Sequence, residues 1–478
     1  MELKDIQGLL IRSHANLPSA AYLLLSIQEV GKSRNWLKTI LPDITTGIEK
    51  PLDYRMQIAF TFSGLQKLGV GDFVQHGFSV EFVQGMITEH KRRVLGDLGT
   101  SSPENWKWGG SNGPDVDAVL MLFAENSDRL EKHIKELQEA MPEEGMLMIH
   151  RLDTEVNAYQ KEHFGFRDGI SQPVIPGLGK KGTPENTVPA GEFILGYPNA
   201  YHQLPESPVI DPKHDPTDVL PTSENFPGFK DFGKNGSYMV FRQLVQDVPG
   251  FWESVLSSVK NEHPDSGPEE AIHLATKMVG RWPNGKPITL SRDKEEPYDK
   301  NLDEDYLYAE KDADGSGCPF GSHIRRANPR DAMPDNTPQN AIRISNRHRI
   351  LRRGRNFGAP LAPTFAPQDL IKAMPDGQER GLQFICFNTN IQRQFEFIQH
   401  SWSNNTKFAG LYSDPDPILG IKDSRNKSET HDFTMQGKIL RRKVVGLRRH
   451  VHVLGGAYFF MPGMKALQFL DNYSPENP

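Results

Sequence analysis

One short segment places a single carboxylate in a tight turn. Residues 165–173 read Gly-Phe-Arg-Asp-Gly-Ile-Ser-Gln-Pro, and Asp168 lies near two glycines that let the backbone turn sharply and approach a flat partner closely. The carboxylate of an Asp-Gly turn more often caps its own backbone than binds a ligand. Alone, the segment predicts either a structural turn or a carboxylate that faces a ligand.

A second segment combines a histidine with several arginines. His323 could bind a metal ion through one ring nitrogen while the other donates to a carboxylate or carbonyl behind it. Arg325, Arg326 and Arg330 follow it, and guanidinium groups bind carboxylates in pairs of hydrogen bonds. Because the chain has 16 histidines, a surface histidine in a solvated basic loop stays open as the alternative.

A third segment ends an apolar stretch with an arginine. Residues 348–358 read His-Arg-Ile-Leu-Arg-Arg-Gly-Arg-Asn-Phe-Gly, and the alternation predicts a half-buried strand that delivers Arg352 at its end. A buried arginine needs a partner. Negative charge that develops on a leaving oxygen would be such a partner.

The elements that must position these segments follow a similar order in both halves of the chain. Residues 127–141 are predicted as a helix with Ser127 as its N-cap, and residues 262–348 as a long irregular, functional loop. Other predicted strands are residues 6–12, 57–63, 117–123, 146–152, 236–244, 348–353, 382–388 and 457–461. Other predicted helices are 18–41, 81–94, 248–259 and 391–402, the last with Phe395, Ile398 and Trp402 at helical spacing.

This succession predicts an α+β protein with two ferredoxin-like halves and antiparallel sheets. A Pro/Gly-rich stretch at about residues 173–230 separates the halves, which we place at residues 1–225 and 226–478. The N-terminal half carries the Asp168 turn, and the C-terminal half carries His323 and Arg352.

Composition excludes several classes of protein. With 37% apolar and 24% charged residues the chain is typical of a globular protein in water, and a net charge of −6 gives no general attraction for nucleic acid. The basic cluster at residues 441–443 is expected to be a solvated strand end, with a small anion site as the alternative. Cys318 and Cys386 are too few for a disulfide framework or a zinc site.

The N-terminus lacks the features of a signal peptide, and no apolar run is long enough to cross a bilayer. We therefore expect a cytoplasmic protein without a membrane partner. A secreted mature chain whose signal has been removed stays open.

Together and in this order, the three segments resemble the dye-decolourising peroxidases. The matching motifs are Gly-x-x-Asp-Gly at 165–169, His323 followed by Asn-Pro-Arg, the strand and Phe-Gly turn at 350–358, and Gly-Leu-x-Phe at 381–384. Further similar stretches are residues 5–8, 191–197, 236–242 and 277–282. The resemblance covers nearly the whole chain, and its length and long loops are similar to the larger, mostly fungal-type members.

The resemblance implies haem b (iron protoporphyrin IX), held mainly by the C-terminal half. His323 would be the proximal ligand of the iron, and Arg330 would contact a propionate. Asp168 and Arg352 would lie on the distal face. Asp168 would move a proton between the peroxide oxygens, while Arg352 would stabilise the developing charge.

Four further residues receive roles from the same resemblance. Leu382 and Phe384 would form an apolar pair over the distal haem, and ordinary strand core is the alternative for both. The carboxylate behind His323 is expected to be Asp416, with Glu396 in reserve. Trp402 is a candidate surface radical site, although plain helix-face core is the expected role.

The implied activity is the oxidation of organic donors, such as dyes and phenolics, by hydrogen peroxide in one-electron steps through an oxo-ferryl porphyrin radical. Two alternatives stay open: a haem-handling or iron-releasing protein with incidental peroxidase activity, and a duplicated module without a cofactor. Expected partners are hydrogen peroxide and small aromatic donors, with no nucleic acid. The chain is expected to be a monomer or a homodimer.

Overall fold

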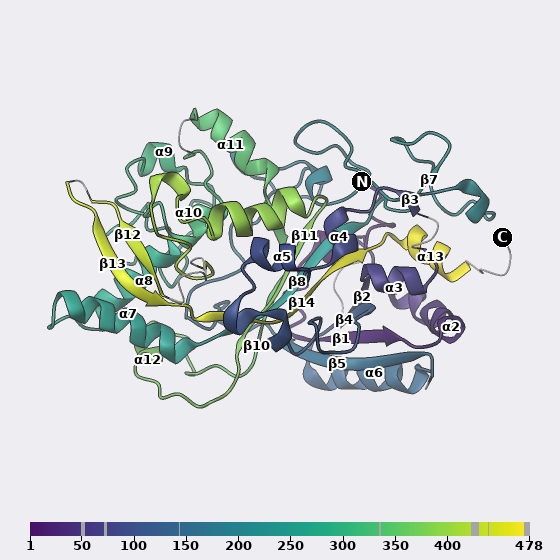
Figure 1. Cartoon of the computed structure of the whole chain (residues 1–478), viewed down its shortest axis with the longest axis horizontal. Coiled ribbons are helices and arrows are strands. Elements are labelled where there is room, and N and C mark those ends of the chain that lie inside the picture. The colour runs from purple at the N-terminus through teal and green to yellow at the C-terminus, as the bar shows by residue number, and fades with distance from the viewer. Residues whose placement is uncertain are drawn as a thin grey trace.

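The computed structural model describes residues 1–48, 53–70, 74–142, 144–333, 336–421, 430–437 and 439–472 (Figure 1). Its strands are β1 (Ser19–Ile27), β2 (Tyr54–Phe60), β3 (Val74–His76), β4 (Ala118–Ala124), β5 (Met146–Glu155), β6 (Val209–Ile210), β7 (Lys230–Asp231), β8 (Ser237–Gln246), β9 (Leu351–Arg352), β10 (Arg355–Phe357), β11 (Gly381–Asn388), β12 (Thr430–Met435), β13 (Arg442–Arg448) and β14 (Val451–Met461).

Most helices lie between these strands or in the long connections of the C-terminal half. The α-helices are α1 (Gly8–Ile11), α2 (Val30–Ile40), α3 (Phe62–Lys67), α4 (Val80–Gln84), α5 (Glu89–Leu95), α6 (Ser127–Ala140), α7 (Val248–Glu262), α8 (Pro268–Val279), α9 (Tyr308–Lys311), α10 (His323–Ala327), α11 (Pro338–Arg347), α12 (Pro367–Leu370) and α13 (Met464–Asn472). Two π-helical segments follow β11, namely η7 (Gln392–Glu396) and η8 (Ile398–Ser403). Short 3₁₀ turns are η1 (Leu41–Asp43), η2 (Gly99–Ser101), η3 (Pro103–Asn105), η4 (Pro184–Asn186), η5 (Ala190–Glu192), η6 (Pro212–His214) and η9 (Phe408–Gly410).

The main sheet consists of two antiparallel halves with the same strand order. Its strands follow the order β10-β5-β1-β4-β2-β14-β8-β11-β9. Counting only the N-terminal strands of this sheet, which exclude β3, the order β5-β1-β4-β2 places the fourth strand first, followed by the first, third and second. The order β14-β8-β11, followed by β9 and β10, repeats this pattern. The predicted α+β fold with two ferredoxin-like halves and antiparallel sheets is therefore confirmed.

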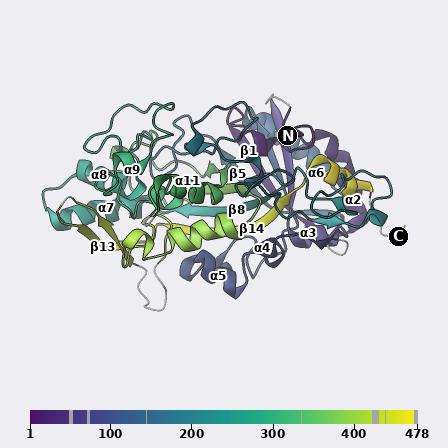
Figure 2. The same cartoon turned by 90° about the horizontal axis from the view of Figure 1, so that it is seen from above.

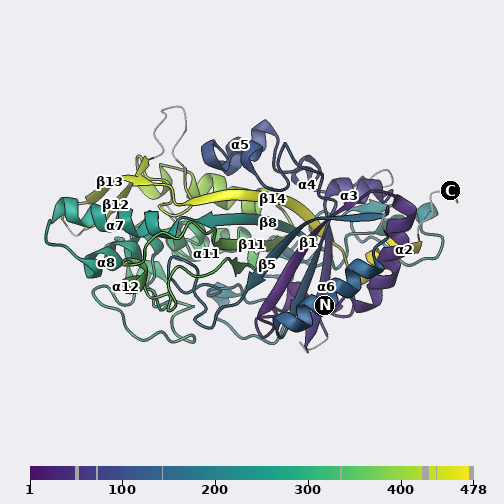
Figure 3. The ribbon, with the colours of Figure 1, turned by 90° about the horizontal axis from the view of Figure 1, so that it is seen from below.

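The two halves of the sheet join at both edges. Phe60 of β2 pairs with Phe460 of β14, Asn356 of β10 pairs with Glu155 of β5, and β10 also pairs with β11. In Figures 1 and 3, β8, β11 and β14 run from the middle of the molecule toward the end that holds α7 and α8. Figures 2 and 3 show α4 and α5 beside β14. The sheet thus closes on itself and connects the two halves of the chain.

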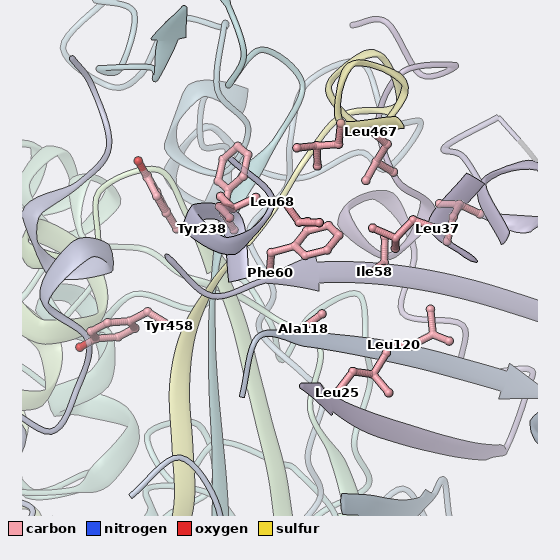
Figure 4. Packing of buried hydrophobic residues seen from close by; sticks show 14 of the residues in the cluster. Leu25, Leu37, Ile58, Phe60, Leu68, Ala118, Leu120, Tyr238, Tyr458 and Leu467 are labelled. Carbon is pink, nitrogen blue, oxygen red and sulfur yellow. The ribbon is translucent and has the colours of Figure 1, made fainter. Parts of the chain in front are cut away.

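Both faces of the main sheet are buried. Alternate residues of β1 belong to different apolar clusters, with Leu23 on one face and Leu24 on the other. Figure 4 shows Leu120 and Leu25 of the sheet on the face that α2 and α13 cover with Leu37 and Leu467. A strand that is buried on both faces reads as a continuous apolar run rather than an alternating one.

That double burial explains the largest error in the predicted elements. Residues 18–41 were predicted as one helix, but the structure has β1 and then α2. The run from Ser19 to Ile27 is almost entirely apolar, so its period does not separate a buried strand from a buried helix. The Glu29 side chain then caps α2 by accepting from the N–H groups of Gly31 and Lys32.

Other predicted elements differ in extent or type. The strand at 6–12 is wrong, because that segment forms the short helix α1 with Leu9 and Leu10 buried. The helix at 81–94 is divided into α4 and α5 at Gly85, whose φ is 71°. Helix α6 is capped by Asn126, one residue before the predicted Ser127. Sequence analysis found neither β12 nor β13, and the expected solvated cluster at 441–443 lies at the start of β13 with Arg442 paired to Glu262.

The segment predicted as a long irregular loop, 262–348, is more ordered than expected. It contains α8, α9, α10 and α11. Each of these helices is short, and proline begins α8 and α11, so the Pro-rich composition marks helix starts as well as loops. No helix in the described ranges is both long and apolar enough to cross a membrane.

The chain returns to its N-terminal half at its end. Helix α13 packs on α2, and both lie at the same end of the molecule in Figure 1. Phe469 and Leu470 of α13 belong to the cluster that covers the N-terminal sheet. The boundary between residues 225 and 226 stays a prediction. Helix α13 comes after this boundary in the sequence but packs against the N-terminal half.

We predict that Leu120→Ala lowers the free energy of unfolding by about 2–5 kcal/mol, because it leaves a cavity between the sheet and its helices. Leu120 is fully buried, whereas Leu147 on β5 is 51% exposed. Leu147→Ala is the matched control and should change stability by less than about 0.5 kcal/mol. Urea unfolding measures both. Equal losses in the two variants would show that the described core does not hold the fold.

Candidate active site

A large cavity lies where the ends of β8 and β11 meet α10, η7, η8 and the turn at residues 165–169. Its empty space, counted out to the open mouth, is about 1620 Å³. The residues that line it come from both halves of the chain, between Glu162 and Val451.

His323 begins α10 and projects into this cavity from one side. Its Nδ1 lies 2.8 Å from Oδ2 of Asp416, and the side chain is 28% exposed, toward the cavity that it lines. Asp416 is fully buried, and its Oδ1 accepts from the N–H groups of Ile418 and Leu419 at 2.8 and 3.1 Å. Because Nδ1 is bound to a carboxylate, Nε2 is the nitrogen that is free to act on a ligand.

The pair has a strong mutual electrostatic effect. Burial alone lowers the pKa of His323, but the charge and hydrogen bond of Asp416 overcome this and raise it. Burial likewise raises the pKa of Asp416, and the His323 charge and hydrogen bond overcome it and lower that pKa. The expected partner of His323 is thus the one that the structure places beside it.

Glu396, the reserve candidate, lies in a different buried network. Its carboxylate is 2.7 Å from Nζ of Lys91 and accepts from the Tyr458 hydroxyl at 2.8 Å. It is therefore already neutralised by a lysine.

Two of the three arginines after His323 turn away from the cavity. Arg325 is buried, pairs with Asp312 at 3.2 Å and lies over the Tyr308 ring. Arg326, fully buried, donates to the carbonyl oxygens of Trp402 and Asn405 at 2.6 and 2.9 Å. Arg326 thus holds α10 against η8 and the loop after it, and Arg325 holds it against the segment around Asp312, so the expected cationic surface at this loop is reduced to Arg330.

Arg330 belongs to a group of arginines that line one end of the cavity. Arg281 and Arg330 both donate to Oγ of Ser171, at 2.8 and 3.2 Å, and Arg349 donates to its carbonyl oxygen at 3.0 Å. Burial and then the charges of Arg330 and Arg352 lower the pKa of Arg349 to about 9. Among the described residues, Arg281, Arg330 and Arg349 donate hydrogen bonds only to uncharged oxygen atoms. This end of the cavity is built for an anion.

Asp168 and Arg352 lie together in the cavity that His323 also lines. Arg352 Nη1 is 3.3 Å from Asp168 Oδ1, and Arg352 also donates to the carbonyl of Ile170 at 2.7 Å. Asp168 Oδ1 accepts from the N–H of Gly169 at 2.7 Å, as in the structural turn that was one alternative. Both side chains nevertheless line the cavity, with 38% and 34% exposed. Both of their charges act on the His323 imidazole.

Leu382 and Phe384 line the cavity from β11. They are two residues apart on one strand and therefore point to the same face. The Phe384 ring lies 6.2 Å from the ring of Phe395, which also lines the cavity. The wall that they form is apolar and excludes water from the polar groups opposite.

The helix after β11 lines the cavity with a face that the sequence did not predict. Phe395, Ile398, Gln399 and Ser403 face the cavity, instead of the predicted row that ended at Trp402. The segment is π-helical, so each turn takes up more residues than in an α-helix and shifts the lining position from 402 to 403.

Trp402 itself is 4% exposed. Its ring packs against those of His348 and Phe397, with centroids 5.1 and 5.3 Å away. A radical site at the surface is therefore the wrong role for this residue, and helix-face core is correct.

Glu162 and Gln246 are among the polar groups of the cavity that sequence analysis missed. Glu162 lies six residues before Asp168, and Gln246 ends β8. Their type and spacing match no catalytic pattern. The only signal was the proximity of Glu162 to the Asp168 turn, and only the fold brings Gln246 to it.

Known proteins of one family are similar to this chain in sequence. The family model described as the DyP dimeric alpha+beta barrel domain matches residues 5–157. A dye-decolorizing peroxidase of Mycena epipterygia is 29% identical over 90% of this chain and 79% of its own length. Dye-decolorizing peroxidase msp1 of Mycetinis scorodonius is 27% identical over 98% of this chain and 87% of its own.

Solved structures agree as well. An ancestral D-type dye-decolorizing peroxidase superposes with a TM-score of 0.77 and 26% identity, over 98% of both chains. A dye-decolorizing peroxidase in complex with 2,6-dimethoxyphenol superposes with a TM-score of 0.75 and 23% identity, over 98% of both chains. With these relatives spanning nearly the whole chain, and with the fold and cavity described above, this chain carries the N-terminal domain of the dye-decolourising peroxidases and is similar to these enzymes, in particular to the larger, fungal-type ones.

Proposed function

We propose that this chain binds haem b in the cavity and uses hydrogen peroxide to oxidise small aromatic donors such as dyes and phenolics. One observation carries the proposal: His323, backed by Asp416, and the Asp168–Arg352 pair line a single cavity. Peroxide activation needs a metal ligand and a proton-handling pair in one site.

The residues present fit the group. The free Nε2 of His323 suits an iron ligand, and Asp416 would make it a stronger donor. Arg281, Arg330 and Arg349 would receive carboxylates at one end, and their lack of charged partners among described residues supports this. Leu382 and Phe384 supply an apolar wall for a flat ring. When bound, haem would supply the redox chemistry that these side chains lack.

The chain's own contribution is to move a proton and to stabilise charge. Asp168 can accept a proton from one oxygen of hydrogen peroxide and donate it to the other, which leaves as water. Arg352, 3.3 Å from Asp168, stabilises the negative charge that develops on the leaving oxygen. The apolar wall lowers the local dielectric, which strengthens both effects.

The donor class rests on a relative rather than on this cavity. The solved structure of a related peroxidase in complex with 2,6-dimethoxyphenol supports phenolic donors for this chain too. Electrons from a donor would return the protein to its resting state in single steps.

Absorption spectra of the purified, haem-supplemented protein test the proposal, taken before and after one equivalent of hydrogen peroxide. We expect a haem band that changes with peroxide and returns when a phenol is added. A haem band indifferent to peroxide, with fast loss of iron, would indicate haem handling instead. A protein that takes up no haem would indicate a module without a cofactor.

We predict that Asp168→Asn retains haem but slows the reaction with peroxide by roughly 10²–10⁴-fold, because the amide cannot accept the proton. Stopped-flow absorption measures the rate. Asp376→Asn is a matched control, because Asp376 also precedes a positive-φ glycine and pairs with an arginine, Arg380, away from the cavity. An unchanged rate in Asp168→Asn would remove Asp168 from the mechanism.

For His323→Ala we expect haem affinity to fall by roughly 10–100-fold or more, since no second histidine lines the described cavity. Haem titration followed by its absorption band measures the affinity. His90→Ala removes an exposed histidine outside the cavity and should bind haem as the wild type does. A wild-type spectrum in His323→Ala would show that another residue holds the iron.

A further inference from the structure

Glu162 is a second carboxylate of the cavity, and its hydrogen bonds close the segment that leads to Asp168. Its Oε1 accepts from the N–H of Phe166 at 2.8 Å, and its Oε2 accepts from the N–H of Phe164 at 2.9 Å. Its backbone N–H donates to the carbonyl of Phe166, and its carbonyl accepts from the N–H of Gly165. Residues 162–166 therefore form a small ring around one side chain.

This ring connects the turn to the centre of the C-terminal sheet. Nε2 of Gln246, the last residue of β8, donates to Oε2 of Glu162 at 2.6 Å. Gln246 is 5% exposed, and its Oε1 is buried without a partner among the described residues. If the Gln246 amide turns over, its Oε1 can accept a hydrogen bond from a protonated Oε2 of Glu162. The pair of side chains can thus exist with or without a proton on Glu162.

We propose that Glu162 is a positioning residue, which holds Asp168 in place through three hydrogen bonds as a carboxylate and releases part of that hold when it is protonated. The inference rests on the proposed function, because it concerns the position of Asp168. When Oε2 is protonated, it donates to Gln246 and accepts less well from the N–H of Phe164, four residues before Asp168. The turn then loses one of the bonds that fix it.

The environment places this change near neutral pH. Burial raises the pKa of Glu162 to about 7, and the charge of Asp168 adds to this, against the three hydrogen bonds, which lower it. The charged or titratable groups on the segment of Glu162 are Lys161, His163, Arg167 and Asp168. Arg380 lies beside Gln246, and Asp247 and His450 lie where β8 ends and β14 begins. Burial lowers the pKa of His163 to about 4, so His163 stays neutral over this range.

The direction of the pH effect depends on which form of Glu162 accepts all three hydrogen bonds. Above its pKa Glu162 is charged, all three bonds are present, and Asp168 is held. Below it, Glu162 is neutral and the turn is looser. We therefore expect the rate of the reaction with peroxide to fall by about threefold to tenfold as pH decreases through 7, the effect of losing one hydrogen bond.

Two measurements on the haem-loaded protein test this. Infrared difference spectra between pH 5 and pH 9 should contain a protonated-carboxyl band that is absent from Glu162→Gln. Stopped-flow rates of Glu162→Gln should be independent of this transition and close to the acid-side rate of the wild type, because the amide has one acceptor oxygen and no titratable proton. Glu155→Gln, which removes an exposed carboxylate at the end of β5, should behave as the wild type does.

Gln246→Met provides a test that keeps Glu162 in place. It removes a hydrogen bond that stabilises the carboxylate form, so the transition should move to higher pH. An infrared band that persists in Glu162→Gln, or the same transition in Glu162→Gln or Gln246→Met as in the wild type, would overturn the proposal. If the wild type does not react with peroxide, the proposed function fails, while the infrared band still reports whether Glu162 titrates.

Discussion

The hydrogen bond between His323 and Asp416 is the interaction on which the site depends. It is made by a carboxylate that is fully buried and that also accepts from two backbone N–H groups, so neither partner is free to rotate. It determines that Nε2 is presented to the cavity. Arg326 supports the pair by joining α10 to the carbonyl groups of Trp402, in η8, and Asn405, just after it. These carbonyl contacts compensate for the cost of burying its charge.

The Asp168–Arg352 pair depends on the duplicated sheet. Asp168 follows β5, the last main-sheet strand of the N-terminal half, and Arg352 lies on β9 of the C-terminal half, 184 residues later in the chain. The two meet because β10, just after Arg352, pairs with both β5 and β11. Closure of the sheet is therefore what brings a carboxylate and a guanidinium from different halves to one distance of 3.3 Å.

A candidate site residue could be identified from the sequence where it lies in a turn or at the end of an alternating strand. Asp168 and Arg352 were singled out in this way and His323 by the arginines around it, their roles were expected only from the resemblance of the three segments together, and the repeated order of elements predicted two antiparallel halves. Errors arose where tertiary structure overrides local pattern. The doubly buried β1 has no period to read, the π-helix shifts the lining face by one residue, and Arg325 is paired with a carboxylate that the sequence does not identify.

The arginines at one end of the cavity show why this site requires an occupant. Three guanidinium groups, of which those of Arg281 and Arg349 are buried, lie beside one serine and donate only to uncharged oxygens of the described residues around them. The charges of Arg330 and Arg352 add to burial in lowering the pKa of Arg349. Such repulsion opposes folding unless an anion offsets it. A ligand with carboxylates at one edge would relieve this repulsion, so its binding and the stability of the fold are coupled.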